Sequence, residues 1–213
     1  MLHIKVFTFN PMEENTYVLY NELKECIIID PGCYDQSEKL ELESFIKDNR
    51  LHPKLLLNTH CHLDHVFGNK FIAEEFKLTL KTHSLEKGVL EMAPTSGLMF
   101  NLPFDNYRGE IIYLEEGEVI QLGEDKLSTI FAAGHSPGSI CFYCEKQHFI
   151  IGGDVLFQNS IGRTDLPGGS HVDLLKNIRE KLFSLPDNVI VYPGHGPKTT
   201  IGEEKKLNPF FIL

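Results

Sequence analysis

Basic residues and long apolar runs are both scarce in this chain of 213 residues. Twenty Lys and Arg stand against thirty Asp and Glu, which gives a formal net charge of −10. A field of that sign repels a phosphate backbone, so nucleic acid is not expected as a partner. No run of about 18 apolar residues exists, and residues 1–9 lack the apolar core and cleavage site of an export signal. We therefore expect a cytoplasmic protein with no membrane partner.

Cysteine is also too sparse to form a disulfide framework. The chain has an odd number of cysteines, scattered along its length: Cys26, Cys33, Cys61, Cys141 and Cys144. Reduced thiols are expected, because a chain of this size can build its own core. About 70% of the unfolded surface can be buried at this length, which fits a single domain over residues 1–213.

Short apolar runs that end at Gly, Pro or Asp predict strands along the whole chain. They form two groups, one before residue 60 and one after residue 118: 2–9, 16–20, 26–30, 55–57, 126–132, 140–144, 148–152 and 189–192. Helical spacing of apolar residues occurs at 38–49, 66–76 and 172–185. Because strands and helices interleave in both halves, we predict an α/β fold in which helices cover a pair of sheets.

The segment 84–107 lies between these two groups and is less regular. Pro94, Gly97 and Pro103 surround an apolar cluster at residues 98–100. This composition predicts a loop or short helices. Two interpretations are open: the segment is a lid over a site, or its apolar groups pack on the domain.

Residues 58–65, Asn-Thr-His-Cys-His-Leu-Asp-His, are rich in groups that bind metals. Four such groups fall within six residues: His60, His62, Asp64 and His65. In an extended stretch His60 and His62 point the same way, whereas Asp64 and His65 lie where the chain turns into a helix. One segment can therefore serve two neighbouring metal positions.

Three further candidates each follow a predicted strand directly. His135 lies in Gly-His-Ser-Pro-Gly, Asp154 in Gly-Gly-Asp and His195 in Pro-Gly-His-Gly-Pro. Loops at strand ends present functional groups, and flanking glycines allow close backbone approach. Five imidazoles and two carboxylates suit two divalent metal ions, zinc best, with iron or manganese admissible because no thiolate is needed. The other histidines lack this context and are interpreted as structural: His3, His52, His83, His148 and His171.

Such a centre would attract an anionic substrate locally. Two divalent ions, two aspartates and one bridging hydroxide leave a net charge of roughly +1 in the pocket. Arg163 is the best-placed cation for a substrate carboxylate, and a structural ion pair is its equal alternative. We expect a small-molecule substrate.

Two other motifs imitate catalytic ones. The Gly-x-Ser-x-Gly pattern around Ser136 fails as a nucleophile elbow, because Pro137 has no N–H for an oxyanion hole and a strand follows. Cys141 and Cys144 have redox-motif spacing, but they lie within a strand and face opposite sides. Cys61 is expected to point away from its histidine neighbours and to pack.

The ordered pattern of these ligands resembles the metallo-β-lactamase superfamily, most closely its glyoxalase II (hydroxyacylglutathione hydrolase) branch. The resemblance covers nearly the whole chain and implies an αββα sandwich of two mixed β-sheets flanked by helices. It also implies two ligand groups bridged by Asp154: His60, His62 and His135, and then Asp64, His65 and His195.

The chain departs from glyoxalase II enzymes at its C-terminal end. Those enzymes carry a helical extension that contacts glutathione, whereas only 18 residues follow His195. We therefore expect no glutathione-binding C-terminal helical domain. Residues 161–169 are similar to short bacterial glyoxalase II-like hydrolases and, through Gly-Arg-Thr-Asp, to persulfide dioxygenases.

The predicted reaction is hydrolysis of an anionic thioester by a metal-bridging hydroxide, with Asp64 as both ligand and proton relay. A thiolate leaves with little help from an acid, because its parent pKa is about 8.5. One alternative is an iron-dependent persulfide dioxygenase that uses His60, His135 and Asp154. A lactone, β-lactam or other ester hydrolase and a metal-binding module without catalysis are the remaining interpretations.

Overall fold

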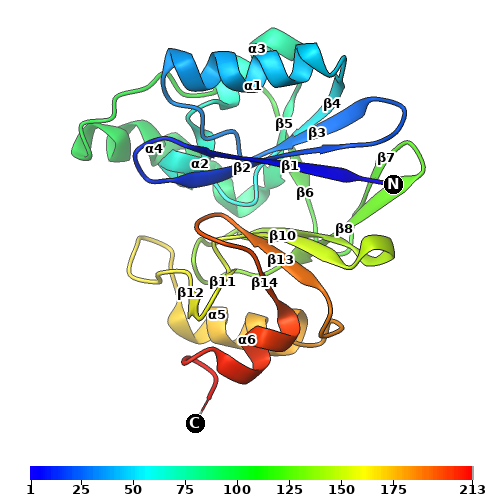
Figure 1. Cartoon of the computed structure of the whole chain (residues 1–213). Helices are drawn as coiled ribbons and strands as arrows, with labels where there is room; N and C mark the ends of the chain where they lie inside the picture. Colours follow the sequence, from blue (N-terminus) through cyan, green and yellow to red (C-terminus); the bar gives the residue numbers. More distant parts are fainter. Residues whose placement is uncertain (213) are drawn as a thin grey trace.

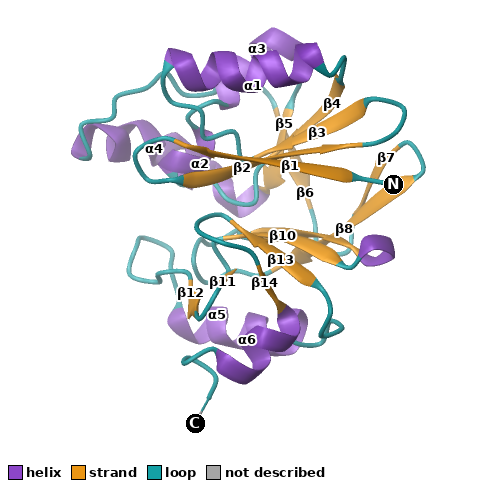
Figure 2. Ribbon diagram, viewed as in Figure 1, coloured by secondary structure: helices purple, strands orange, loops and turns teal. Residues whose placement is uncertain are grey.

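Two six-stranded sheets face each other in the computed structural model of the chain, and helices cover both outer faces (Figure 1). The structure describes residues 1–212. Figure 2 shows the four layers in order: helices, sheet, sheet, helices. The predicted αββα sandwich of two mixed sheets is therefore confirmed.

The first sheet contains the strands of the N-terminal half in sequence order. They are β1 (His3–Phe9), β2 (Glu14–Tyr20), β3 (Glu25–Ile29), β4 (His52–Leu57), β5 (Leu80–His83) and β6 (Ile111–Leu114). The first three pair antiparallel and the rest pair parallel. Parallel neighbours need a crossover, and helices supply it here. These helices are α1 (Gln36–Asp48), α2 (Leu63–Val66), α3 (Asn69–Phe76) and, after the turn η1 (Ser84–Glu86), α4 (Lys87–Met99).

The second sheet is antiparallel except where β10 and β13 pair parallel. Its strands, in spatial order, are β14 (Thr199–Thr200), β13 (Ile190–Pro193), β10 (Phe149–Gly153), β9 (Ile140–Cys144), β8 (Asp125–Phe131) and β7 (Val119–Leu122). The small hairpin of β11 (Leu156–Phe157) and β12 (Ser160–Ile161) follows β10. The outer elements are α5 (His171–Asn177), a π-helical turn at Ile178–Leu182 and α6 (Ile201–Leu207); the turn η2 (Glu145–Gln147) joins β9 to β10.

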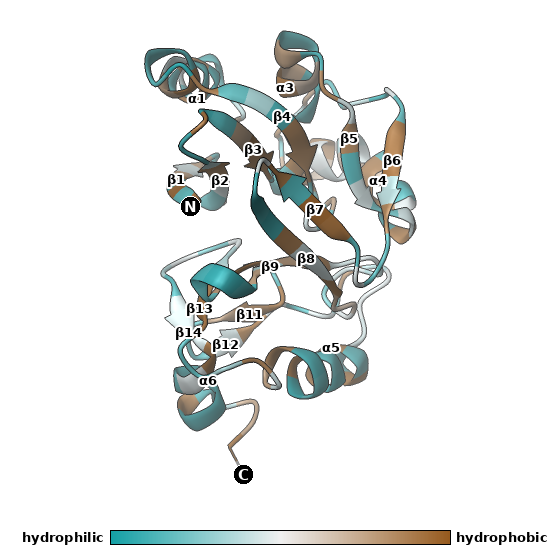
Figure 3. Ribbon diagram, turned by 90° about the vertical axis from the view of Figure 1, so that its right-hand side faces the viewer, coloured by the Kyte–Doolittle hydropathy of each residue, from teal (hydrophilic) through white to brown (hydrophobic). Residues whose placement is uncertain are grey.

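Side chains that alternate along the central strands pack into two different hydrophobic cores. On β2 and β3, Val18 and Ile28 belong to the core under α1 and α3, whereas Leu19 and Ile27 belong to the core between the sheets. Strands buried on both faces require continuous apolar runs, and these strands have them. The outward faces of α1 and α5 are largely hydrophilic (Figure 3).

Two predicted helices are interrupted. The helix expected at 66–76 breaks before α3, because Gly68 approaches another segment too closely for a side chain. A Cβ atom at Gly68 would lie 2.4 Å from Sγ of Cys33, and the Gly68 N–H donates to the carbonyl of Pro31 at 2.7 Å. The helix expected at 172–185 changes from α to π geometry at Ile178.

In residues 84–107, where the sequence predicts a loop or short helices, the structure has the turn η1 followed by one 13-residue helix, α4, which continues through Pro94. A proline inside a helix removes the N–H that would bond to the carbonyl four residues earlier, here that of Leu90. Nδ2 of Asn106 donates to that carbonyl at 2.6 Å instead. A side chain from beyond the helix thus replaces the missing hydrogen bond.

The cysteines are free, in line with the expected reduced thiols, and all five are buried. Across residues 1–212, no helix has the length and apolar character needed to span a bilayer.

Candidate metal centre

All the predicted ligand side chains meet where several strands of both sheets end. His60 and His62 follow β4, and Asp64 and His65 lie in α2. The other three lie in the loops after β8, β10 and β13: His135, Asp154 and His195. Five of the seven are buried, and the other two, His62 and His195, are half-buried, so the convergence is internal rather than a surface coincidence.

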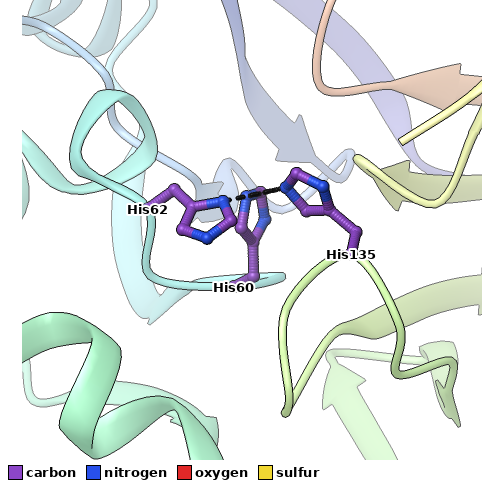
Figure 4. Close-up of side chains that lie close together, drawn as sticks. All are labelled: His60, His62 and His135. Atoms are coloured by element: carbon purple, nitrogen blue, oxygen red, sulfur yellow. Dashed lines mark hydrogen bonds between the residues drawn. The ribbon is translucent and has the colours of Figure 1, made fainter. Parts of the chain in front are cut away.

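Three histidines form the first group (Figure 4). Nδ1 of His62 lies 2.8 Å from Nε2 of His135, which lies 3.2 Å from Nε2 of His60. Tetrahedral zinc with ligand nitrogens at about 2.0–2.1 Å places those nitrogens roughly 3.3 Å apart. The spacing of these nitrogen atoms therefore suits a metal ion between them.

Asp64 and two histidines form the second group. Oδ2 of Asp64 is 3.0 Å from Nε2 of His195 and 3.7 Å from Nε2 of His65. These three ligand atoms also lie close enough together to hold one ion.

Asp154 lies between the two groups. Its Oδ2 is 3.5 Å from Nε2 of His135 and 3.6 Å from Nε2 of His195, and its Oδ1 is 3.5 Å from Nε2 of His65. Within residues 1–212, Oδ1 of Asp154 and Nε2 of His65 are buried with no hydrogen-bond partner. Buried polar atoms without partners are costly, at about 1–3 kcal/mol each, and cations between the groups would satisfy both atoms. The residues present therefore fit a two-metal centre.

Hydrogen bonds at the opposite ring nitrogens orient the histidines. Nδ1 of His135 donates to the carbonyl of Arg163 at 2.8 Å, and Nδ1 of His195 donates to the carbonyl of Met12 at 3.0 Å. Because a carbonyl only accepts, Nδ1 carries the proton and Nε2 keeps its lone pair for a metal. Burial, with His135 alongside, lowers the pKa of His62 to about 4, so this ring is also neutral at pH 7.

Both carboxylates are ionised in this site. Burial opposes the ionisation of Asp64 and Asp154, but the neighbouring His65 outweighs it and lowers the pKa of each carboxyl. Anionic oxygens are the form in which carboxylates bind divalent ions.

The start of β2 holds the loop that carries His195. The N–H of Asn15 donates to the carbonyl of Gly194 at 2.7 Å, and Oη of Tyr17 donates to the carbonyl of Pro193 at 2.6 Å. The loop is thereby fixed to the first sheet as well as to its own strand.

Asp30 is a residue of the site that the sequence reasoning missed. Its Oδ1 accepts from the N–H of Thr59 at 2.7 Å, and its Oδ2 accepts from Oγ1 of Thr59 at 2.6 Å and from Nδ1 of His65 at 3.1 Å. With both oxygens engaged, Asp30 orients His65 rather than serving as a ligand. One signal was available, because Asp30 ends an apolar run before Pro-Gly, as the recognised site loops do at their own strand ends.

Glu86, just before α4, was also missed. This fully buried carboxylate accepts from the N–H of Cys61 at 2.7 Å, Oγ of Ser136 at 2.6 Å and the N–H of Gly138 at 2.6 Å. It therefore ties the loop of His60 and His62 to the loop of His135. Ser136 is a turn residue, as the rejection of the nucleophile elbow predicts.

Glu86→Gln is expected to lower zinc affinity about 10- to 100-fold, the range typical of residues that orient metal ligands. The NH₂ group of the new amide would replace one carboxylate oxygen and face hydrogen-bond donors, such as the N–H of Cys61 or of Gly138, that this oxygen now accepts from. Competition with a chromogenic chelator measures the affinity. Glu91→Gln, at an exposed glutamate of α4, is the control. Equal affinities in the two variants would contradict the positioning role of Glu86.

Arg163 forms an ion pair with its neighbour. Its Nε and Nη2 donate to the two carboxylate oxygens of Asp165 at 2.7 and 2.8 Å, and both side chains are exposed. The structural alternative for Arg163 is thus present, and its contact with a substrate carboxylate stays a prediction. Cys61 packs, with its Sγ 3.9 Å from Oγ1 of Thr82.

Comparison with known proteins places this geometry in context. A family model described as the metallo-beta-lactamase superfamily matches residues 10–195. The hydroxyacylglutathione hydrolase GloC of Haemophilus influenzae is 35% identical over 211 residues, which cover 98% of each chain. The crystal structure of BLEG-1 B3 metallo-beta-lactamase is similar with a TM-score of 0.91 and 37% identity, over 99% of this chain and 100% of that one. The structure of TTHA1623 in a di-iron-bound form is similar with a TM-score of 0.87 and 33% identity, over 97% and 99%.

Proposed function

Because the chain belongs to the metallo-beta-lactamase superfamily and is a metallo-hydrolase, we propose that it hydrolyses thioesters of the hydroxyacylglutathione hydrolase (glyoxalase II) type. The position of Asp154 between two ligand groups carries the proposal, because it suits a pair of ions that act on one substrate. The relation to GloC supports the substrate class. Zinc suits the ligand set, and the di-iron form of TTHA1623 makes iron the first alternative.

Two divalent ions in this site would supply a hydroxide at neutral pH and polarise the scissile carbonyl. The chain's own residues fix the geometry, since backbone carbonyls and Asp30 orient the imidazoles. In the reaction the C–S bond of the thioester breaks, a C–O bond to the water oxygen forms and the sulfur leaves as a thiolate; Asp64 would accept the proton that the water loses in forming hydroxide and pass it to solvent. Apart from the proposed ligands, Cys61 and Arg163 are the ionisable residues lining the cavity within the described chain. A thiolate needs no strong acid to leave, so this lining favours thioesters over amides.

The persulfide dioxygenase alternative uses one iron and two histidines. Nδ1 of His62 lies 2.8 Å from Nε2 of His135, inside the first ligand group. A third imidazole in the group supports a hydrolytic centre over a site of two histidines and one carboxylate. The relation to BLEG-1 keeps β-lactams, with lactones, among the substrates to be tested.

Metal analysis of protein purified without chelator, paired with assays on S-lactoylglutathione and glutathione persulfide, tests the proposal. We expect two ions per chain, thioester hydrolysis, loss of turnover on metal removal and recovery when zinc is restored. One iron per chain with oxygen uptake on the persulfide would replace the hydrolase with a dioxygenase. No turnover on thioesters, lactones, phosphodiesters or persulfides would favour a metal-binding module.

A further inference from the structure

A cavity of about 790 Å³ opens beside the metal centre, and its floor and walls differ in chemistry. The floor carries the candidate ligands, among them Asp64, Asp154 and His195. The walls are largely apolar and include Leu85, Val89, Met92, Ala93, Phe100 and Phe157. The volume is in the range of small-molecule sites, about 300–1,000 Å³.

One helix supplies much of the apolar wall. Val89, Met92, Ala93 and Ser96 recur at the spacing of one helical face along α4, and Phe100 continues the stripe just past its end. The stripe faces the cavity, while Leu90 and Gly97 on another face of α4 are buried. The wall is thus a helical surface held in place by its own core contacts.

Several side chains of this wall are unusually exposed for their type. Leu85 is 53% exposed, Met92 58% and Phe100 57%, although all three line the cavity. A contiguous set of exposed apolar groups at a cavity commonly marks the place where a ligand binds. Their burial would be favourable only if the ligand brings apolar surface of its own.

The cavity offers little to recognise charge away from the metals. Among the described residues that line it, Arg163 is the one Lys or Arg, and Asp165 already engages its guanidinium. A thiol carrier that needs several salt bridges would find few partners here. The charged chemistry of the site is concentrated on the floor.

Building on the thioester hydrolysis proposed above, we infer that, among thioesters, the site prefers those with an apolar group of several carbons next to the scissile bond over the polar hydroxyacylglutathiones, and that this group lies on the stripe of α4. The apolar group belongs either to the acyl part or to the thiol part. Both sources present the same chemistry to Val89, Met92 and Phe100.

The test measures kcat/KM of the metal-loaded full chain on two series of thioesters. One series is S-acyl N-acetylcysteamine with acetyl, butanoyl, hexanoyl and octanoyl groups; the other is acetyl thioesters of alkyl thiols of equal lengths. We expect a rise of up to about fourfold per added methylene in at least one series, the factor for full burial of a CH₂ group. Values that do not rise with length in either series would overturn the inference.

Two matched variants assign the effect to α4. Met92→Glu is expected to lower the ratio of octanoyl to acetyl kcat/KM at least about tenfold, because a charge replaces apolar wall. Leu98→Glu changes an equally exposed apolar residue of α4 that does not line the cavity, and it should leave the ratio unchanged. Equal effects of the two variants, or none, would contradict the assigned wall. Thermal melting confirms that both fold.

A binding measurement separates this inference from the proposed function. Calorimetry with butanoate and octanoate on the metal-loaded protein reports the apolar wall whether or not thioesters are hydrolysed. We expect octanoate to bind at least about tenfold more tightly, and Met92→Glu to remove the difference. Tighter octanoate binding without thioesterase activity would keep the apolar site and reject the thioesterase. Thioester hydrolysis together with equal affinities for butanoate and octanoate would keep the thioesterase and reject the apolar site.

Discussion

His62→Ala is expected to abolish thioester turnover and to leave the fold close to intact. The side chain contributes Nδ1 to the first ligand group, 2.8 Å from Nε2 of His135. Several kcal/mol of transition-state stabilisation depend on a correctly held ion, so the loss in kcat/KM should be about 10³-fold or more. His62 is the residue before α2 but makes no capping hydrogen bond, so the helix loses no side-chain partner.

The measurement pairs kcat/KM with metal content and with the melting temperature of the metal-free protein. His52→Ala, at an exposed histidine that begins β4, is the control and should match the parent chain in all three. Retained turnover in the His62 variant would remove this residue from the centre. Loss of turnover together with global unfolding would show that His62 is structural instead.

Gly194→Ala is expected to disable the centre although it replaces none of the proposed ligands. A Cβ atom at this position would lie 2.1 Å from Oδ1 of Asp154 and 2.6 Å from Cε1 of His65. One of these side chains must move, and a displacement of about 1 Å in a catalytic group typically costs about 10²-fold in rate. Metal occupancy should fall as well, because each of these two side chains belongs to the proposed ligand set.

Gly152→Ala provides a matched control for this prediction. It also adds one methyl group in a buried segment, two residues before Asp154, but its nearest contact would be 3.5 Å to a side-chain carbon of Val191. We expect near-parental metal content and turnover for Gly152→Ala. Equal losses in the two variants would mean that the segment is generally intolerant, whereas no loss in Gly194→Ala would contradict the tight packing of the ligands.

The candidate ligands were predictable from sequence because their signals are local. Four of them fall within six residues, and His135, Asp154 and His195 each follow an apolar run beside glycine. The main strands were predictable for a similar reason, since burial on both faces demands continuous apolar runs. Three four-residue strands, β5, β6 and β7, were missed, whereas the equally short β13 was found because its apolar run, 189–192, stops at Pro-Gly.

Residues that act through distant partners could not be predicted in this way. Glu86 contacts Cys61 and Gly138, which are 25 and 52 residues away, and nothing adjacent to it in sequence distinguishes it from an exposed glutamate. The helix α4 was obscured by Pro94, whose defect is repaired by Asn106 from outside the helix. In both cases tertiary contacts decide what the local pattern leaves open.

Because β2 and the residues just before it anchor the His195 loop, a shortened version of this enzyme must keep them. A fragment trimmed to begin after β2 would still encode every proposed ligand, yet it would lack the backbone carbonyl of Met12, the Asn15 N–H and the Tyr17 hydroxyl that anchor His195. Truncation from that side would therefore yield a chain with the complete motif and one unanchored histidine. A design that moves only the ligand residues into another scaffold would likewise lack the contacts that anchor His195.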